Sequence, residues 1–196
     1  NPNSNLDTEL NHTNYSNDIY ENISKNLNVT QLYGINYESI ESGTSVRKPQ
    51  MTADIINYIN QGVSLINYIG HGSATTLANE KIIDMNRDIA HICSLGTLCQ
   101  EQNKQAIWVV GTCSFGEYDK NEEIMAEKLL FNEFGAIRLI STSRGIGPNP
   151  NNIYLSNLFN KIKDFVLGDE NYRLGDIVKK AKQINQESHY LFHLLG

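Results

Sequence analysis

The chain has 196 residues, enough for one domain, and a chain of this size buries roughly 70% of its unfolded surface. Its hydrophobic fraction of 40% and charged fraction of 19% exclude a disordered or fibrous class. The net charge of -6 repels a phosphate backbone, so nucleic acid is not expected as a partner. No apolar run approaches the roughly 20 residues that cross a bilayer, and the segment is expected to be soluble.

The start of the chain is rich in Asn, Ser and Thr and shows almost no apolar periodicity. Residues 1–18 are therefore predicted to be a loop or a disordered lead-in. No targeting signal is visible there, and the expected organisation is one domain over 19–196 that is a fragment of a larger protein. Apolar spacing predicts a short helix over 19–27 and a strand over 29–33.

Strands and helices alternate through the rest of the chain. Two segments, 63–69 and 107–110, are apolar on both faces, as strands of a covered parallel sheet are, and 136–140 is predicted as a third strand. Helices are predicted after Thr52 as N-cap, after a capping box of Asp119 and Glu122, and over 152–166 and 174–186. This alternation predicts an α/β fold with a mostly parallel sheet and helices on both faces.

Three cysteines, Cys93, Cys99 and Cys113, form an odd and sparse set in a chain with an adequate core. A disulfide framework is therefore not expected, and at least one thiol should be free. The spacing of Cys93 and Cys99 matches no common zinc site, and His91 beside them does not supply one. We expect a half-buried pair of thiols near a helix end and no metal site.

His71 and Cys113 each follow an apolar strand and are each flanked by small residues. Catalytic groups in an open parallel sheet collect at the carboxyl ends of the strands, so neighbouring strands would bring these two side chains into one cleft. A thiol is mostly protonated at neutral pH, and an imidazole that takes its proton makes it a nucleophile. The backbone N–H groups of Gly72 and Cys113 would then stabilise the negative oxygen of the attacked carbonyl. This chemistry needs no metal or cofactor.

Three sequence motifs follow one another along the chain. Residues 66–72 read Ile-Asn-Tyr-Ile-Gly-His-Gly, residues 108–119 read Trp-Val-Val-Gly-Thr-Cys-Ser-Phe-Gly-Glu-Tyr-Asp, and residues 135–144 read Gly-Ala-Ile-Arg-Leu-Ile-Ser-Thr-Ser-Arg. In this order they resemble the gingipain family of cysteine peptidases, which belongs to the caspase-like clan. The closer resemblance within that family is to the PorU-type sortases of type IX secretion systems.

The resemblance implies a caspase-like sandwich with His71 as general base and acid and Cys113 as nucleophile. It implies a cysteine endopeptidase or a sortase-like transpeptidase that processes secreted proteins of a type IX secretion system. The implied location is the bacterial cell surface, the outer membrane or the extracellular space. A peptide or protein substrate, components of the secretion machinery and other domains of the same chain are the expected partners. The family's further strand and acidic loop have no counterpart before Ile19, so no third catalytic residue is assigned.

Three side chains beside these motifs are assigned to substrate binding: Ser73, Glu117 and Arg144. Glu117 and Asp119 would favour a basic substrate residue, although the capping role is preferred for Asp119. Arg144 carries five donors and has no acidic neighbour in sequence, so its partner is a distant carboxylate or the substrate itself.

Other classes of function have less support. A catalytically silent peptide-binding module with the same fold is the alternative, but such a module has no need for both His71 and Cys113. The Gly-x-Gly at 70–72 is not followed by the remaining residues of a phosphate loop. The chain also has no Gly-x-Ser-x-Gly, the motif expected of a small-molecule hydrolase on an α/β sheet. His189 and His193 lie four residues apart without the zincin glutamate, and we interpret them as surface or packing residues.

Overall fold

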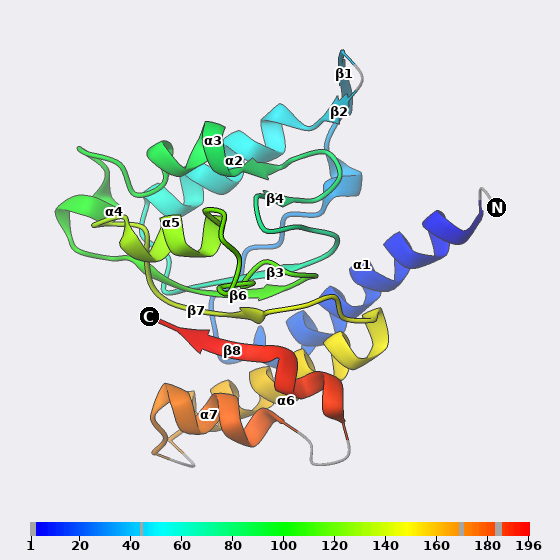
Figure 1. Cartoon of the computed structure of the whole chain (residues 1–196). Helices are drawn as coiled ribbons and strands as arrows, with labels where there is room; N and C mark the ends of the chain where they lie inside the picture. The colour runs from blue at the N-terminus through cyan, green and yellow to red at the C-terminus, as the bar shows by residue number, and fades with distance from the viewer. Residues whose placement is uncertain (1–2, 44, 169–170, 183–185) are drawn as a thin grey trace.

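A four-stranded sheet forms the centre of the computed structural model, which describes residues 3–43, 45–168, 171–182 and 186–196. The strand order is β3-β6-β7-β8, with bounds Leu65–Ile69, Ala106–Gly111, Ala136–Thr142 and Phe192–Leu195. β3 and β7 run parallel to β6, and β8 runs antiparallel to β7. Helices cover both faces of the sheet (Figure 1). The predicted α/β fold with a mostly parallel sheet is confirmed.

Side-chain alternation on each strand divides the core into two layers. Trp108 and Val110 of β6 pack on one face of the sheet, and Val109 packs on the other. All three are at most 1% exposed. A strand buried on both faces must be apolar throughout, which explains the unbroken apolar run that identified β6.

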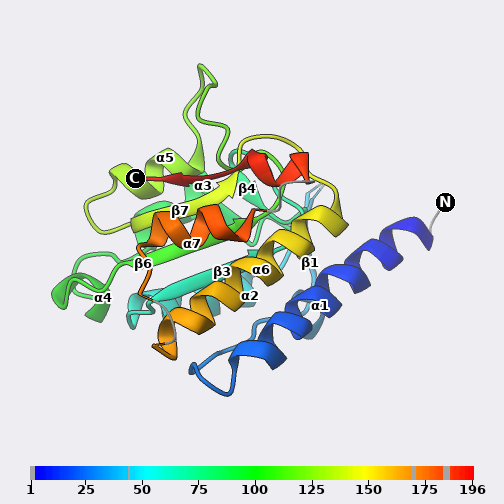
Figure 2. The same ribbon diagram turned by 90° about the horizontal axis from the view of Figure 1, so that it is seen from below.

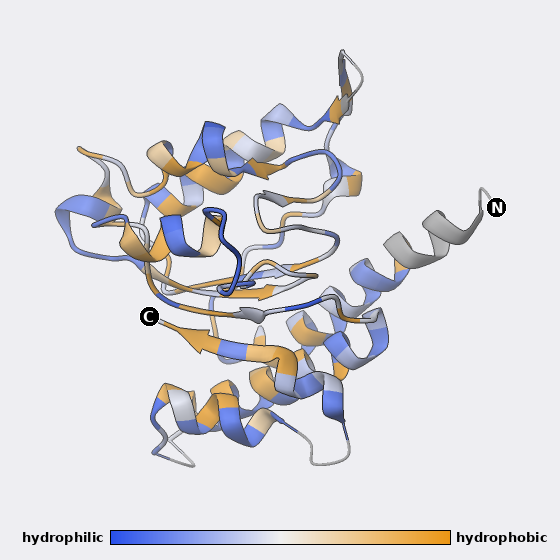
Figure 3. Ribbon diagram, in the orientation of Figure 1, coloured by the Kyte–Doolittle hydropathy of each residue, from blue (hydrophilic) through white to orange (hydrophobic). Residues whose placement is uncertain are grey.

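The helices belong to two layers, one on each face. The layer over Trp108 contains α2 (Pro49–Asn60), α3 (Met85–Asp88), α4 (Leu98–Glu101) and α5 (Met125–Phe131). The layer over Val109 contains α1 (Asn3–Ile23), α6 (Pro148–Val166) and α7 (Leu174–Ala181), of which α1 and α6 lie side by side (Figure 2). The helices carry apolar and hydrophilic colours on different sides in Figure 3, as expected for helices that cover a core on one face. Within the described residues, no helix has both the length and the apolar character needed to cross a membrane.

Smaller elements complete the chain. Two short antiparallel hairpins pair β1 (Ile40–Ser42) with β2 (Ser45–Arg47) and β4 (Thr76–Leu77) with β5 (Ile83–Asp84). The short 3₁₀ helices are η1 (Gly34–Asn36), η2 (Ile89–His91) and η3 (Glu187–Leu191).

The lead-in predicted over residues 1–18 is wrong for the described residues, because α1 starts at Asn3. Asn and Ser are poor helix formers, but packing against neighbouring elements overrides their weak preference. Ile19 and Ile23 are 4% and 5% exposed in the core shared with α6. The amide of Asn22 also donates to Asn160 Oδ1 of α6 at 2.7 Å.

Four further element predictions need correction. Thr52 is not an N-cap, because α2 begins at Pro49 and its N-cap is Lys48. Residues 29–33 are not a β-strand, because they pair with no strand of the described chain. Asp119 and Glu122 do not cap the next helix, because α5 begins only at Met125 and its N-cap, Ile124, makes no side-chain capping bond. The helix predicted over 174–186 ends at Ala181, and residues 183–185 lie outside the described part.

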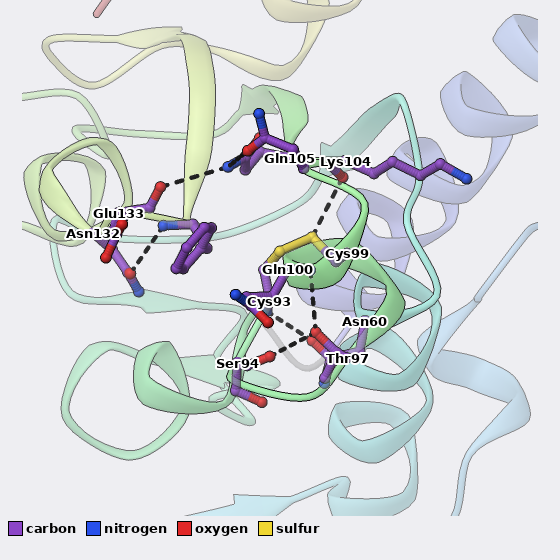
Figure 4. The surroundings of a disulfide bond; sticks show 12 residues. Asn60, Cys93, Ser94, Thr97, Cys99, Gln100, Lys104, Gln105, Asn132 and Glu133 are labelled. Carbon is purple, nitrogen blue, oxygen red and sulfur yellow. Dashed lines mark hydrogen bonds between the residues drawn. A yellow bond between two sulfur atoms is a disulfide. The ribbon is translucent and has the colours of Figure 1, made fainter.

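A disulfide bond joins Cys93 and Cys99, so the expectation of two free thiols there is wrong (Figure 4). Their Cα atoms lie 5.2 Å apart, and both side chains are 1% exposed. The side chain of Asn60 on α2 holds the backbone at this bridge, since its Oδ1 accepts from the Cys93 N–H at 2.7 Å. Cys113 is a free thiol, as the odd number of cysteines predicted.

Candidate active site

The register between β3 and β6 brings the two candidate catalytic residues to neighbouring positions. Leu65 lies opposite Ile107 and Ile69 opposite Gly111, so partners are 42 positions apart along the whole pairing. His71 and Cys113 are separated by the same 42 positions and each follows the last pair by two residues. Parallel neighbours lie about 4.8 Å apart and end at the same edge of the sheet. Both residues therefore lie at the carboxyl edge, on adjacent strands.

Gly72 and Thr112 show how closely the two loops approach. A Cβ atom on Gly72 would lie 2.7 Å from Thr112 Oγ1 and 2.8 Å from its Cγ2. No real side chain accepts such contacts, and glycine is needed because it has no Cβ. Each of these residues is next in sequence to a candidate catalytic residue, so the contact fixes the loop of His71 against that of Cys113.

Residues 70–78, here called the base loop, are held mostly by backbone hydrogen bonds. The carbonyl of His71 accepts from the Ala78 N–H at 2.8 Å and from the Tyr68 hydroxyl at 2.6 Å. The N–H of Met125 on α5 donates to Ala74 O at 2.7 Å. Ser73 Oγ accepts from the Thr76 N–H at 3.1 Å, so this side chain shapes the loop.

The imidazole of His71 itself is exposed. Its ring contacts that of His12 on α1, with centroids 5.2 Å apart and ring planes at 86°. Sequence reasoning missed His12, because the surrounding Asn-rich stretch was interpreted as a loop. His12 lies seven residues before the buried Ile19, so on a helix the two residues share one face. Predicting a helix for this stretch would therefore have placed His12 on the inner face of α1.

Residues 112–119, here called the nucleophile loop, are tied to β7 and to the segment after it. Thr142 Oγ1 of β7 donates a short hydrogen bond to Thr112 O. The N–H of Gly116 donates to Thr142 O at 2.9 Å, and the N–H of Ser114 donates to Arg144 O at 3.2 Å. Cys113 is half-buried, with Sγ 3.6 Å from Ile146 O.

Ser114 has a φ of 53°, in the left-handed region that a residue with a Cβ enters only at a cost. This conformation turns the chain immediately after Cys113. Backbone strain of this kind occurs at functional sites, where the surrounding hydrogen bonds enforce it.

Asn151 is a second residue that sequence reasoning missed. It lies in the first turn of α6, is 3% exposed, and its Nδ2 donates to Gly111 O at 2.9 Å. The contact requires close approach, since a Cβ on Gly111 would lie 2.9 Å from Asn151 Oδ1. In sequence, Asn151 has the helical spacing that places it on the same face of α6 as the buried Tyr154, Leu155 and Leu158. This spacing could have identified Asn151 as an inward-facing residue.

Arg144 has a distant carboxylate as partner, the first of the two alternatives that its sequence context left open. Its Nη1 donates to Asp119 Oδ1 at 2.9 Å and its Nη2 donates to Asp119 Oδ2 at 2.5 Å. This two-bond contact lowers the pKa of Asp119 and raises that of Arg144. The preferred capping role for Asp119 is therefore wrong. The pair links the far end of the nucleophile loop to the segment after β7.

Glu117 lies beside this pair, and its side chain is only 16% exposed. Its carboxylate is 3.1 Å from Lys120 Nζ and 3.9 Å from Arg144 Nη1. The charge that was expected to select a basic substrate residue is thus already close to two cations. His193 packs its ring against Tyr118 at 5.4 Å.

A cavity of about 620 Å³ lies beside His71. It is lined by α1, residues 32–39, β3 and residues 78–82. Both ring nitrogens of His12 and Oδ1 of Asn67 are buried and unpaired. Burial lowers the pKa of His12, and the neighbouring His71 lowers it further.

The two proposed oxyanion donors are available for a ligand. Within the described residues, the backbone N–H groups of Gly72 and Cys113 donate no backbone hydrogen bond. The described side chains also contain no cluster of three groups that would hold a metal ion.

The fold is that of the caspase-like cysteine peptidases. The model of peptidase family C25 matches residues 2–196, so this chain belongs to that family, the gingipain family of cysteine peptidases. No curated protein sequence matches the chain significantly.

Solved structures with this fold include the Arg-specific cysteine proteinase gingipain R (RgpB), with a TM-score of 0.61 over 80% of this chain. The complex of the pro- and mature domains of Porphyromonas gingivalis RgpB gives 0.54 over 80%, and a chain described as a protease gives 0.57 over 71%. Each is 16% identical to this chain, a level at which the likeness shows the fold alone. This chain spans only 36%, 36% and 35% of the lengths of those chains.

Proposed function

We propose that this chain is the catalytic domain of a cysteine peptidase with Cys113 as nucleophile and His71 as general base and acid. One observation carries the proposal. Paired residues of β3 and β6 are 42 positions apart in sequence, and so are His71 and Cys113, which lie just beyond the ends of these strands. This shared spacing makes His71 and Cys113 neighbours at the sheet edge where catalytic groups of parallel sheets collect.

The chemistry follows from the two residues and the backbone around them. His71 takes the thiol proton while Cys113 Sγ attacks the scissile carbonyl carbon. The negative oxygen of the resulting tetrahedral intermediate accepts hydrogen bonds from the N–H groups of Gly72 and Cys113. His71 then gives the proton to the leaving amine, and the acyl group stays on sulfur. Attack by water or by another amine releases it and restores the thiol.

Three side chains border this path in the proposal: Ser73, Glu117 and Arg144. Ser73 lies in the base loop, next to the oxyanion donor Gly72. Glu117 and Arg144 lie beyond Cys113, where they would meet the substrate on the far side of the cleaved bond. Because the Arg144 side chain is 50% exposed, its remaining donors are open to a substrate carbonyl or carboxylate.

The finer assignment is a PorU-type sortase that processes secreted proteins of a type IX secretion system at the bacterial surface or outer membrane. The three motifs support it, as does the Cys93–Cys99 bridge, because disulfides persist mainly in oxidising compartments outside the cytoplasm. Substrate proteins, the secretion machinery and other domains of the full-length protein are the proposed partners.

The decisive experiment measures peptide cleavage by Cys113→Ala and His71→Ala, with His91→Ala as a matched exposed histidine. Each catalytic variant is expected to lose at least about 10³-fold in kcat/KM with unchanged thermal unfolding, while His91→Ala cleaves like the parent. Parental cleavage by Cys113→Ala would remove the nucleophile assignment. Adding a primary amine distinguishes the two fates of the acyl-enzyme, since a transpeptidase yields the amide of that amine.

A further inference from the structure

The ring of His71 has an unusual environment for a proposed general base. A catalytic imidazole is normally oriented by a third group that contacts it. Within the described part of the chain, no carboxylate pairs with His71, and the side-chain contact that its ring makes is with His12. The bonds to Tyr68 and Ala78 fix only its backbone.

The contact with His12 has the geometry of an edge-to-face aromatic pair. The centroids are 5.2 Å apart and the planes are at 86°, within the range preferred by such pairs. Both nitrogens of His12 are buried without a hydrogen-bond partner. The His12 side chain is therefore held in place by packing, and the feature it presents to His71 is its ring.

His12 is carried on a firmly docked helix. Ile19 and Ile23, further along α1, are buried against α6. Asn22 adds two polar ties to α6, since it donates to Asn160 at 2.7 Å and accepts from Lys163 Nζ at 2.5 Å. The position of His12 is thus set by the fold, whereas the side chain of His71 is exposed.

We propose that His12 is a positioning residue: its ring packs against His71 and limits the orientations open to that imidazole, so that it can take the proton of Cys113. This inference rests on the proposed function and goes beyond it, because it assigns the orienting role to a neutral aromatic ring on α1. A buried imidazole stays neutral at pH 7 and does not repel the imidazolium that forms when His71 takes the thiol proton.

The test uses the rate of alkylation of Cys113 by iodoacetamide at pH 7, with the disulfide intact. Cys113 is the free cysteine of the structure, so its labelling reports how far His71 activates it, independently of any peptide substrate. His71→Ala is expected to slow labelling at least about tenfold. His12→Ala is expected to slow it roughly two- to tenfold, the equivalent of an edge-to-face contact. His12→Phe keeps the ring and is expected to recover most of that loss.

The double variant decides whether His12 acts through His71. If it does, His12→Ala has no further effect in the His71→Ala background, because the interaction it supplies is already gone. Ile23→Val on α1 is the matched control: it is expected to weaken the helix packing but to leave the labelling rate within about twofold.

Two results overturn the inference in distinguishable ways. If His71→Ala slows labelling but His12→Ala does not, or slows it equally in both backgrounds, the pair of His71 and Cys113 stands and the role of His12 fails. If His71→Ala leaves labelling unchanged, the proposed catalytic pair fails and the role of His12 fails with it.

Discussion

The two loops of the candidate site are held in different ways. The nucleophile loop, residues 112–119, depends on side-chain ties from Thr142 and Arg144 as well as on main-chain bonds, and Asn151 of α6 holds Gly111 immediately before the loop. The base loop, residues 70–78, is tied mainly by main-chain bonds, including those between Ala78 and His71 and between Met125 and Ala74. Main-chain bonds survive most substitutions, whereas a side-chain tie is lost with one residue. Point substitutions should therefore disturb the nucleophile loop more readily than the base loop.

Among the ties in and next to the nucleophile loop, the bond from Asn151 to Gly111 should have the largest effect when it is removed. Asn151→Ala leaves the buried carbonyl of Gly111 without its donor, and loss of such a partner costs about 2 to 3 kcal/mol in the free energy of unfolding. Urea unfolding measures this, and peptide cleavage should fall as well. Asn149→Ala, exposed in the same helical turn, is the control and should match the parent. Equal stability of both variants would show that the tie is unimportant.

Removing the disulfide should separate stability from catalysis. Replacing Cys93 and Cys99 together with Ala opens a short covalent loop, and the loop-entropy relation gives a loss of about 2 kcal/mol. Cleavage by the folded variant should stay within about twofold of the parent, because the bridge lies by α4, away from both site loops. A large loss of kcat at a temperature where the variant is fully folded would contradict this.

Acid should weaken the fold through three histidines that are wholly or partly buried. Burial lowers the pKa of His12, His189 and His193 below the ordinary value. The unfolded chain then binds more protons than the folded chain, so their contribution is complete above pH 6.5 and declines as pH falls through the lowered values. Thermal unfolding should occur at a lower temperature at pH 5.0 than at pH 7.5. His189→Gln should reduce that difference, and an unchanged difference would remove His189 from the explanation.

Arg144 should give the smallest effect, because its contact with Asp119 is exposed to solvent. Surface ion pairs contribute little to stability, so Arg144→Ala should unfold at nearly the parental temperature. Cleavage should fall by less than about tenfold, and Arg144→Lys should recover only part of it, since an ammonium cannot make both bonds at once. Comparing kcat/KM of both variants on one peptide measures this. Asp119→Asn separates the two roles: it should reproduce the Arg144 loss if the pair braces the loop, and spare activity if Arg144 binds substrate directly.

The sequence predicted the parts of the fold that depend on local apolar pattern. β6 was recognisable because a strand buried on both faces cannot alternate, and β3 because its apolar residues pack on both layers of the core. The polar residues that follow both strands stand out. The matched positions of His71 and Cys113 followed from the same pattern, and their catalytic roles stay predictions.

The features that were missed depend on distant partners. The helix α1 has an Asn-rich sequence of low helix preference, and it is stabilised by α6, which lies more than a hundred residues away. Arg144 and Asp119 are 25 positions apart in sequence, so no local spacing links them. The bridge between Cys93 and Cys99 is an exception, since its partners are only six positions apart. It was missed because counting three cysteines in an adequate core favoured free thiols.

The constant register between β3 and β6 also determines where the molecule should accept added sequence. The distance between His71 and Cys113 in space is set by the sheet, and the crossover after the base loop, from Asn79 to Gln105, only has to return the chain to the start of β6. Lengthening a surface loop costs little entropy. Leu95, at the tip of the crossover, is 89% exposed, and the disulfide closes that loop at its base. A peptide tag or a small reporter domain inserted beside Leu95 should therefore leave the catalytic edge as it is.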